Sequence, residues 1–470
     1  MPTYKTPGVY VEEISTLPPS VAEVSTAIPA FLGYTEKGPK LARVNTLLEF
    51  EESFGGAKPR SFSVRTSSGD GPKTIEEVSA VDCDSDLPEL LLYYCIQHYF
   101  KNGGGPCYVL SVGDYSKPPA KDDFSDGLTL LEKEDEPTLI LLTDAVLLPA
   151  PDYYELCGQV LSQCNKLGDR FGVFDVKDGD VDGFRDQIGT NYLMYGAAYH
   201  PYLRTSLSHD YEEDGVLIAG GAAAEGGDGG AAEEGGGEAE AAESEAGGEA
   251  GGGSLAAIKS TETGLYNTIK TALTKERVVL PPSAAMAGIY ASVDRDRGVW
   301  KAPANVSVAA VIGPTLKIDH GQQEALNIDP TGGKSINAIR EFTGKGTLVW
   351  GARTLAGNDN EWRYISVRRL FNMIEESAQK ATSFAVFEPN DMATWLKVKG
   401  MIESYLYGLW EQGALAGPAP EASYFVNVGL GKTMTNQDIL EGRMVVEIGV
   451  AAVRPAEFII LRFSHKLQEA

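Results

Sequence analysis

The chain has 470 residues, a hydrophobic fraction of 43% and a formal net charge of -26. This length predicts more than one domain, each large enough for a core, and the acidic balance argues against nucleic acid and anionic membrane surfaces as partners. No apolar run approaches the roughly 18 residues that a membrane-spanning helix needs, so we expect no membrane insertion. The N-terminus also lacks the basic and apolar regions of a signal peptide.

The five cysteines and five histidines are scattered along the chain. No two cysteines form a CxxC pair, which favours a reduced, cytoplasmic origin. The histidines do not have the spacing of metal ligands either. We therefore expect neither a metal nor a cofactor in this protein.

The first predicted element is a β-strand without a partner nearby in the sequence. Val9 and Val11 fall on one face of this strand and Tyr10 and Glu12 on the other, which is the alternation of a half-buried strand. Prolines on both sides disfavour a tight hairpin, because proline restricts the backbone and removes a hydrogen-bond donor. The strand must then pair far away in the chain or with another molecule, which indicates assembly.

Strands alternate with helices between residues 31 and 199. Strands are predicted at residues 31–34, 107–112, 138–142, 171–176 and 192–199, and helices at 90–100, 153–167 and 181–188. This alternation predicts a partly parallel sheet with helices packed on it. For the whole chain we expect a mixed α/β and α+β fold in several domains, with extended strands as arms at both ends.

Residues 220–253 consist almost entirely of glycine, alanine and glutamate. They include nine acidic residues and no basic residue. Such a segment cannot form a core, and its glycines and mutually repelling charges predict a solvated loop. We interpret it as a tolerated surface insertion, since loop length has little effect on stability, or as an acidic coat on the outside of an assembly.

Helices predominate after this insertion, and the chain ends in predicted strands. Val367, Leu370 and Ile374 share one face of a predicted helix, the pattern of an amphipathic helix. Helices are predicted at residues 255–273, 364–381 and from 391 onward, and strands at 444–453 and 458–463. The chain therefore ends, as it begins, in extended structure.

Two glycine-lysine segments and one acidic run are incomplete ligand-binding motifs. A phosphate-binding loop that ends at Lys334 needs a glycine where Ile328 stands, and the segment at Lys432 fails in the same way. The acidic run that begins at Asp178 lacks the closing glutamate of a calcium loop, since Gly189 holds that position. We interpret these segments as turns and helix caps, and the sequence predicts no catalytic residues.

Four segments of the last third carry a family resemblance. They are Arg297-Gly298-Val299-Trp300, Trp350-Gly351-Ala352-Arg353, Phe387-Glu388-Pro389-Asn390 and Pro455-Ala456-Glu457-Phe458. Together with Pro7-Gly8-Val9-Tyr10 near the start, they resemble the contractile tail sheath proteins. These proteins form the outer sleeve of contractile phage tails, R-type bacteriocins and phage-tail-like extracellular injection systems.

The resemblance implies a structural subunit rather than an enzyme. Similar sheaths stack as hexameric rings around a rigid inner tube and contract to drive the tube through a target envelope. The implied partners are further copies of this chain, the inner tube protein, and baseplate and terminal cap proteins. The resemblance also implies assembly in the bacterial cytoplasm, as part of a virion tail or of a released extracellular particle.

The resemblance further implies that extended arms at both ends add strands to the sheets of neighbouring subunits. The residues expected to carry this contact are Pro7, Val9, Val11 and Ile14 in the first arm and Phe458, Ile460 and Phe463 in the last. Arg368 and Arg369 are adjacent on a predicted helix and cannot face the same way. We expect one of them to pair internally and the other to meet the tube or a neighbouring subunit.

These expectations divide the chain into five parts. They are an N-terminal arm (1–25), an α/β region (26–205), an outer variable region that holds the insertion (206–280), a C-terminal sheath domain that lies inside and faces the tube (281–455), and a C-terminal strand arm (456–470). The inner and outer placements follow from the resemblance alone.

Three other interpretations compete with a contractile sheath subunit of the phage or extracellular type. The first is an enzyme, either a nucleotide hydrolase that uses Lys334 or another hydrolase built on the α/β region. The second is a static filament or capsid-like protein that never contracts. The third is one half of a type VI secretion sheath, although those sheaths are typically split over two chains and this chain carries both ends.

Overall fold

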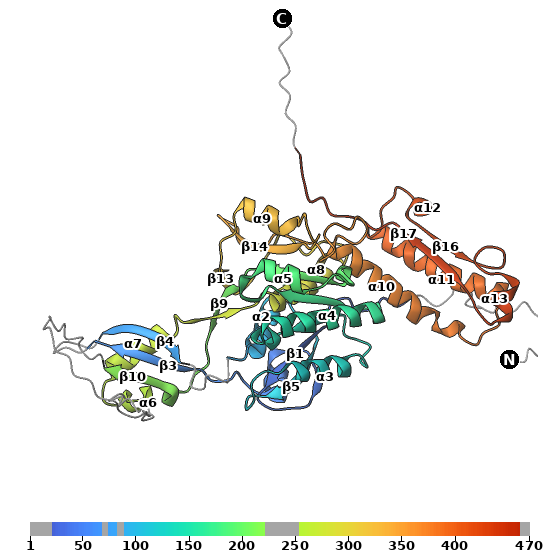
Figure 1. The fold of residues 1–470 in the computed structure, drawn as a ribbon. Helices are drawn as coiled ribbons and strands as arrows, with labels where there is room; N and C mark the ends of the chain where they lie inside the picture. The colour runs from blue at the N-terminus through green and yellow to red at the C-terminus, as the bar shows by residue number, and fades with distance from the viewer. Residues whose placement is uncertain (1–20, 68–73, 82–88, 221–252, 461–470) are drawn as a thin grey trace, which may run out of the picture.

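The computed structural model describes residues 21–67, 74–81, 89–220 and 253–460. Its centre is a nine-stranded sheet (Figure 1). In sheet order the strands are β12 (Val306–Ser307), β15 (Gly346–Val349), β14 (Ile336–Phe342), β8 (Gly196–His200), β7 (Phe171–Asp175), β6 (Leu139–Leu142), β1 (Pro29–Thr35), β5 (Cys107–Asp114) and β2 (Leu41–Val44). The strands from β14 to β5 run parallel, and antiparallel strands extend both sides.

The central strands are buried on both faces. All seven residues of β1, all four of β6 and all five of β7 are buried. Such continuous burial is typical of parallel strands that helices cover on both sides, and it confirms the strands predicted at residues 31–34, 138–142 and 171–176. The strand predicted at residues 192–199 begins only at Gly196, because a 3-10 turn occupies residues 193–195.

Helices cover the sheet in two layers. α2 (Leu92–Lys101) and α8 (Ser283–Arg297) pack together in one layer, and α3 (Lys121–Leu131), α4 (Ala150–Leu167) and α5 (Val181–Gln187) pack in the other. The chain reaches β5 from β1 through α2 and then crosses back over β1 to β6 through α3. The step from β1 to β5 and the step from β5 to β6 run in opposite directions along the sheet. Since both crossovers are expected to be right-handed, α2 and α3 lie on opposite faces of the sheet. The fold is doubly wound, with its switch point at the end of β1.

A small second unit combines two distant stretches of the chain. It comprises β3 (Ser61–Thr66), β4 (Ile75–Val81), β10 (Val216–Gly220), α6 (Leu255–Ile258) and α7 (Thr263–Leu273), and it stands apart from the body in Figure 1. Phe62, Val64 and Ile269 belong to its separate core. The helix predicted at residues 255–273 is therefore two helices. The unit also recruits the strands of residues 61–81, which lie outside the outer region expected at 206–280.

A third unit forms the C-terminal part of the described chain. α10 (Ile365–Thr382) and α11 (Met392–Glu411) pack against the antiparallel pair β16 (Tyr424–Val428) and β17 (Val446–Val450). Leu370, Ile374 and Ile402 lie in its core. Asp391 caps α11 by accepting hydrogen bonds from two backbone N–H groups of the first turn, which confirms the predicted helix start. The central sheet includes β14, so the main core crosses the boundary expected at residue 281.

Short elements complete the described chain. They are α1 (Leu47–Phe54), α9 (His320–Asn327), α12 (Pro420–Ser423), α13 (Asn436–Leu440) and the three-stranded sheet of β11 (Arg277–Leu280), β9 (Leu203–Ser208) and β13 (Val311–Pro314), besides isolated 3-10 turns. Within the described ranges, each helix is too short or too polar to cross a membrane.

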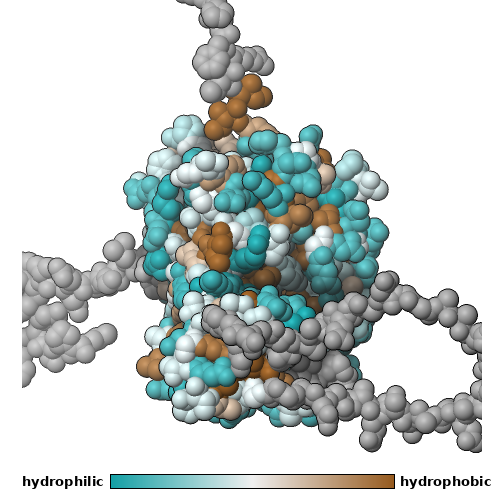
Figure 2. Space-filling model, turned by 90° about the vertical axis from the view of Figure 1, so that its left-hand side faces the viewer, coloured by the Kyte–Doolittle hydropathy of each residue, from teal (hydrophilic) through white to brown (hydrophobic). Residues whose placement is uncertain are grey.

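The surface is mostly polar, with local apolar exceptions. Figure 2 shows polar and apolar side chains interspersed over one face, and apolar residues where the described chain ends at the top. There Phe458, Ile459 and Ile460 are 68%, 80% and 77% exposed. Three consecutive large apolar side chains in water are unfavourable, so this end of the chain is suited to contact another surface.

Candidate assembly surface

The switch point of the sheet, where doubly wound folds commonly bind ligands, is filled by the protein itself. The carboxylate of Asp144, just after β6, accepts hydrogen bonds from the backbone N–H groups of Tyr34, Leu91 and Leu92 at 2.7, 2.6 and 3.1 Å. Its burial raises the pKa of Asp144 to about 6, against the opposing effect of these bonds. The N-terminus of α2, the kind of position that binds phosphate elsewhere, is therefore capped by a side chain.

The segment around Lys334 is a closed turn. The carboxylate of Asp329 accepts hydrogen bonds from the backbone N–H groups of Gly332 and Lys334, both at 3.1 Å. The buried Lys334 side chain donates to the carbonyl oxygen of Arg185. The donors that a phosphate loop would offer are thus engaged internally, which confirms the interpretation as a turn. Asp180 likewise caps α5, as predicted.

Arg369 fastens the beginning of the described chain to the body. Its guanidinium donates to the carboxylate of Asp294 at 2.5 Å and to the carbonyl oxygen of Thr26 at 2.9 Å. The Thr26 hydroxyl donates to the same carboxylate at 2.6 Å, and the guanidinium lies 4.6 Å from the ring centre of Tyr290. Arg369 is 4% exposed, so the root of the N-terminal segment is held by a buried ion pair.

Arg368 also points into the subunit. It donates to the side-chain oxygens of Asn372 at 2.7 Å and Glu375 at 3.0 Å, and its guanidinium lies 4.2 Å from a ring centre of Trp362. Both arginines are thus engaged within the subunit, and contact of either one with the tube or a neighbour stays a prediction. Both are paired internally because the first turns of α10 are buried all round, from Ile365 onward.

Arg353 fastens the other end of the described chain. Its guanidinium forms a two-point ion pair with the carboxylate of Glu457, at 2.9 Å from Nε to Oε1 and 2.6 Å from Nη2 to Oε2. The side-chain amide of Asn327 donates to Oε1 at 2.8 Å and the hydroxyl of Tyr364 to Oε2 at 3.3 Å. Burial alone raises the pKa of Glu457, but the bonds from Arg353 and Asn327 outweigh it, and the pKa is lowered. The exposed residues 458–460 begin directly after this anchor.

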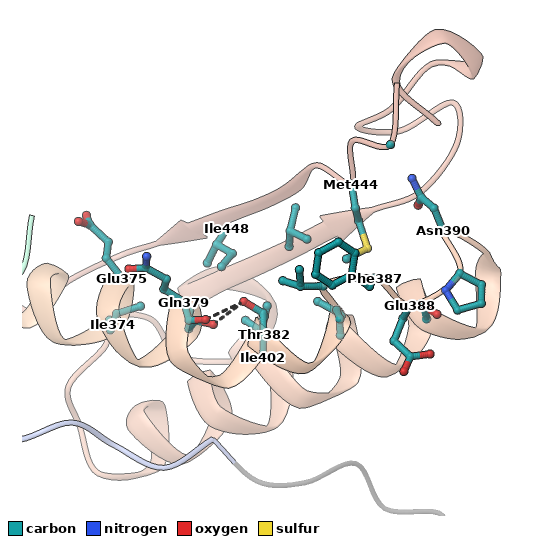
Figure 3. Close-up of a pocket in the computed structure, with 18 of the residues that line it drawn as sticks. Ile374, Glu375, Gln379, Thr382, Phe387, Glu388, Asn390, Ile402, Met444 and Ile448 are labelled. Carbon is teal, nitrogen blue, oxygen red and sulfur yellow. Dashed lines mark hydrogen bonds between the residues drawn. The ribbon is translucent and has the colours of Figure 1, made fainter. Parts of the chain in front are cut away.

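An apolar groove of about 960 Å³ lies between α10, α11 and β17 (Figure 3). Ile374 and Ala378 of α10 and Val398 and Ile402 of α11 line it. Its polar residues come mainly from the loop that joins the two helices and from one side of α10, and they include Glu375, Gln379, Thr382, Glu388 and Asn390. The lining therefore suits a peptide segment with apolar side chains, whose polar backbone groups can bind the polar residues of the groove.

The strands beside the groove have unpaired edges. β16 and β17 pair with each other and with none of the other strands that the structure describes. Val446, Ile448 and Val450, alternate residues of β17, line the groove and are only half-buried. A further strand along β17 would bind its free backbone groups and cover these side chains.

The residues expected in the two arms are only partly within the described chain. Pro7, Val9, Val11 and Ile14, like Phe463, lie outside the described residues. Phe458 and Ile460 are exposed, and no strand pairing within the subunit is found for residues 453–460. Their contact with another subunit stays a prediction.

Sequence reasoning missed the groove and the two anchors. A strand was predicted at residues 444–453, but the groove arises only where β17 packs beside the helices α10 and α11. The ion pair of Arg353 and Glu457 joins two of the segments that carry the family resemblance, yet nothing in the spacing of those segments indicated a contact.

The chain is similar to solved sheath structures along its whole length. The helical sheath of the anti-feeding prophage in its contracted state is 30% identical, with a TM-score of 0.65 over 99% of this chain and 100% of that chain. This chain belongs to the contractile tail sheath proteins. The contracted sheath complex of an extracellular contractile injection system, PVC, is 29% identical to this sheath protein, with a TM-score of 0.62 over 99% of each chain.

Partial matches lead to the same family. Residues 357–466 of this sheath protein match the phage tail sheath C-terminal domain. The tail sheath protein of Vibrio phage KVP40 is 25% identical over 186 residues, 39% of this chain and 26% of the phage protein. A putative prophage major tail sheath protein of Pseudomonas aeruginosa is 24% identical over 38% of this chain and 44% of the relative. The sheath protein thus matches less than half of the length of either relative.

Proposed function

We propose that this sheath protein polymerises as stacked hexameric rings around an inner tube and contracts to drive the tube through a target envelope. The observation that carries this proposal is the groove beside β17, with half-buried apolar side chains and an unpaired strand edge. The exposed apolar residues 458–460 supply a matching surface on the same molecule. Because the groove and the apolar segment that could fill it belong to the same chain, they favour self-assembly.

Each groove accepts an extended arm from another copy. The N-terminal candidates are Pro7, Val9, Val11 and Ile14, and the C-terminal candidates are Phe458, Ile460 and Phe463. Alternate side chains of the added strand fill the apolar groove, and its backbone pairs with β17. The described chain leads away from its own groove after Glu457 (Figure 1), which favours an arm from a second subunit.

Contraction is driven by stored conformational energy. The sheath assembles in a metastable extended lattice, and a signal from the baseplate lets subunits rotate as rigid bodies into a shorter and wider lattice that buries more surface. A gain of about 1 kcal/mol per subunit is small for one protein but adds up over many linked subunits. The anchors at Arg369 and Arg353 fix the roots of both arms, so that the arms keep neighbours connected while the bodies move.

The remaining partners and placements follow the same proposal. The C-terminal region of residues 281–455 lies inside and faces the tube protein, and the region of residues 206–280 lies outside. Baseplate and terminal cap proteins bind the two ends of the sheath. The particle assembles in the bacterial cytoplasm and works as a virion tail or as a released extracellular particle. Neither a cofactor nor catalysis is part of this function.

Deletion of residues 2–14 tests the arm hypothesis. We expect the truncated chain to fold but to form no sheath of normal length in electron micrographs. Normal sheaths that still contract would contradict the hypothesis. A single lattice pitch with and without a contraction trigger would favour a static filament instead, and nucleotide binding that is lost in Lys334→Ala would favour an enzyme.

A further inference from the structure

Phe387, in the loop between α10 and α11, is unfavourably placed for an isolated subunit. Its side chain is 103% exposed, more than any other large apolar side chain of the described residues. Its backbone φ of 69° lies in the left-handed region, which bulky residues rarely adopt. Exposure and strain together are typical of a residue that meets a partner.

The surrounding loop holds Phe387 in this conformation. The backbone N–H of Glu388 donates to the carbonyl oxygen of Ala385 at 3.2 Å. The side-chain amide of Asn390 donates to the carbonyl oxygen of Arg443 at 3.0 Å and accepts a hydrogen bond from the indole N–H of Trp395 at 2.7 Å. Because the loop is tied both to α11 and to the segment before β17, these hydrogen bonds maintain the strained backbone of Phe387 while its ring stays exposed.

Phe387 belongs to the groove beside β17. It lines the groove together with Val386 and Met444, and Figure 3 shows it at the same end as Met444, Glu388 and Asn390. The groove is open on this side, since the ring of Phe387 is fully exposed. A chain lying along β17 would therefore pass beneath or beside a fully exposed aromatic ring.

We infer that Phe387 closes over an extended apolar segment of a second copy of this chain and clamps it in the groove. The inference rests on the proposed function and names Phe387 as a residue on which binding of the neighbouring arm depends. A large ring that becomes buried against aliphatic or aromatic side chains contributes strongly to binding, and such residues dominate interface energies. The occupant is a terminal segment of the second copy, because the exposed residues 458–460 are apolar and have no cover in their own subunit.

Two substitutions separate the role of the ring from the strain of the backbone. Phe387→Gly removes the ring and relieves the strain, since glycine adopts positive φ freely, whereas Phe387→Ala removes the ring only. We expect the melting temperature of the unassembled subunit to be unchanged or higher for Phe387→Gly. For both variants we expect the critical concentration for sheath formation, measured by sedimentation of the full-length chain, to rise about tenfold or more.

Leu440→Ala is the matched control. Leu440 is 82% exposed and apolar but does not line the groove, so its removal is expected to leave the critical concentration unchanged. A photo-crosslinking residue at position 387 in the assembled sheath is expected to join a terminal segment, within residues 1–20 or 458–470, of another copy.

Four results would overturn the clamp. Three of them are an unchanged critical concentration in both Phe387 variants, a rise that Leu440→Ala shares, and a crosslink to the tube protein or to another part of the sheath. A lower melting temperature for both Phe387 variants would also overturn it, because the ring would then stabilise its own subunit. If the unmodified chain forms no sheath at all, the proposed function fails and the clamp with it.

Discussion

Arg353 and Glu457 form a two-point ion pair across 104 positions of the chain, with a shortest N···O distance of 2.6 Å. Arg353 is buried, and Glu457 directly precedes the exposed apolar residues 458–460. The pair therefore marks the place where the fixed body ends and the C-terminal arm begins. Bidentate pairing restricts both distance and orientation, so it sets the direction in which the arm leaves.

Glu457→Gln should release the root of this arm. The amide retains the shape but loses the charge, and a buried arginine without its carboxylate is destabilised by about 2 kcal/mol or more. Because few buried contacts hold residues 453–460, we expect local opening, measured as faster hydrogen exchange in this segment, and little change in melting temperature. Glu403→Gln, which weakens a partly exposed pair with Lys399, should change neither the exchange rate nor the melting temperature. Unchanged exchange in Glu457→Gln would refute the anchor.

Arg369→Ala should destabilise the whole subunit. It leaves the carboxylate of Asp294, 7% exposed, without its guanidinium partner, and breaking a buried pair in this way lowers the free energy of unfolding by about 3 to 5 kcal/mol. Arg43→Ala, in an exposed pair with Glu136, should lower it by less than about 1 kcal/mol. Urea denaturation of the purified subunits measures both values. Equal decreases in the free energy of unfolding of the two variants would contradict the assignment of Arg369 as a structural anchor.

Asp175 should make the subunit less stable as the pH rises. Its carboxylate, fully buried beside the start of α8, accepts a hydrogen bond from the backbone N–H of Ser283 at 2.8 Å, and burial raises its pKa to about 7. The folded state then keeps a proton that the unfolded state releases above its ordinary pKa of 3.8, so stability falls between pH 4 and 7, by up to about 1.4 kcal/mol per pH unit.

Asp175→Asn removes this titration while preserving an acceptor for Ser283. We therefore expect the melting temperature of the variant, relative to the unmodified chain, to rise steadily from pH 5 to pH 7. A difference that stays constant over this range would show that Asp175 is ionised in the folded protein.

The acidic insertion should be dispensable. The described residues on either side of it are held together, since the backbone N–H of Ile218 donates to the carbonyl oxygen of Gly253 at 3.1 Å and Leu217 bridges to Ser254. Replacement of residues 222–252 by a short glycine-serine linker should leave the melting temperature and sheath formation unchanged. Loss of sheaths in electron micrographs, with an unchanged melting temperature, would show that the insertion takes part in assembly.

Strands β1, β5, β6, β7 and β8 of the central sheet could be predicted from the sequence, because burial on both faces requires apolar runs such as residues 139–142. The remaining strands of this sheet, β2, β12, β14 and β15, were not predicted. The small unit could not be predicted, because β3 pairs with β10 across more than a hundred residues and neither strand has a distinctive pattern. The anchors were missed for a related reason. Adjacent residues such as Arg368 and Arg369 point in different directions, and their partners depend on how α10 packs, which no local pattern reveals.

Assembly could be predicted from the apolar strand pattern at Val9 and Val11, and the family from segments such as Phe387-Glu388-Pro389-Asn390. The groove could not be predicted, because α10, α11 and β17 form it jointly, and each looks like an ordinary amphipathic element by itself. The half-burial of Val446, Ile448 and Val450 depends on this packing, so it becomes visible only in the structure.

The proposed assembly depends on β17 receiving a strand from another copy of the chain. A cryo-electron microscopy reconstruction of the assembled sheath tests it most directly, because the backbone beside β17 can be traced to its own subunit. We expect an extended terminal segment of a neighbouring subunit, within residues 1–20 or 458–470, hydrogen-bonded to Val446–Val450 in the groove. A groove that is empty in the assembled sheath, or filled by the same subunit's own chain or by the tube protein, would contradict it.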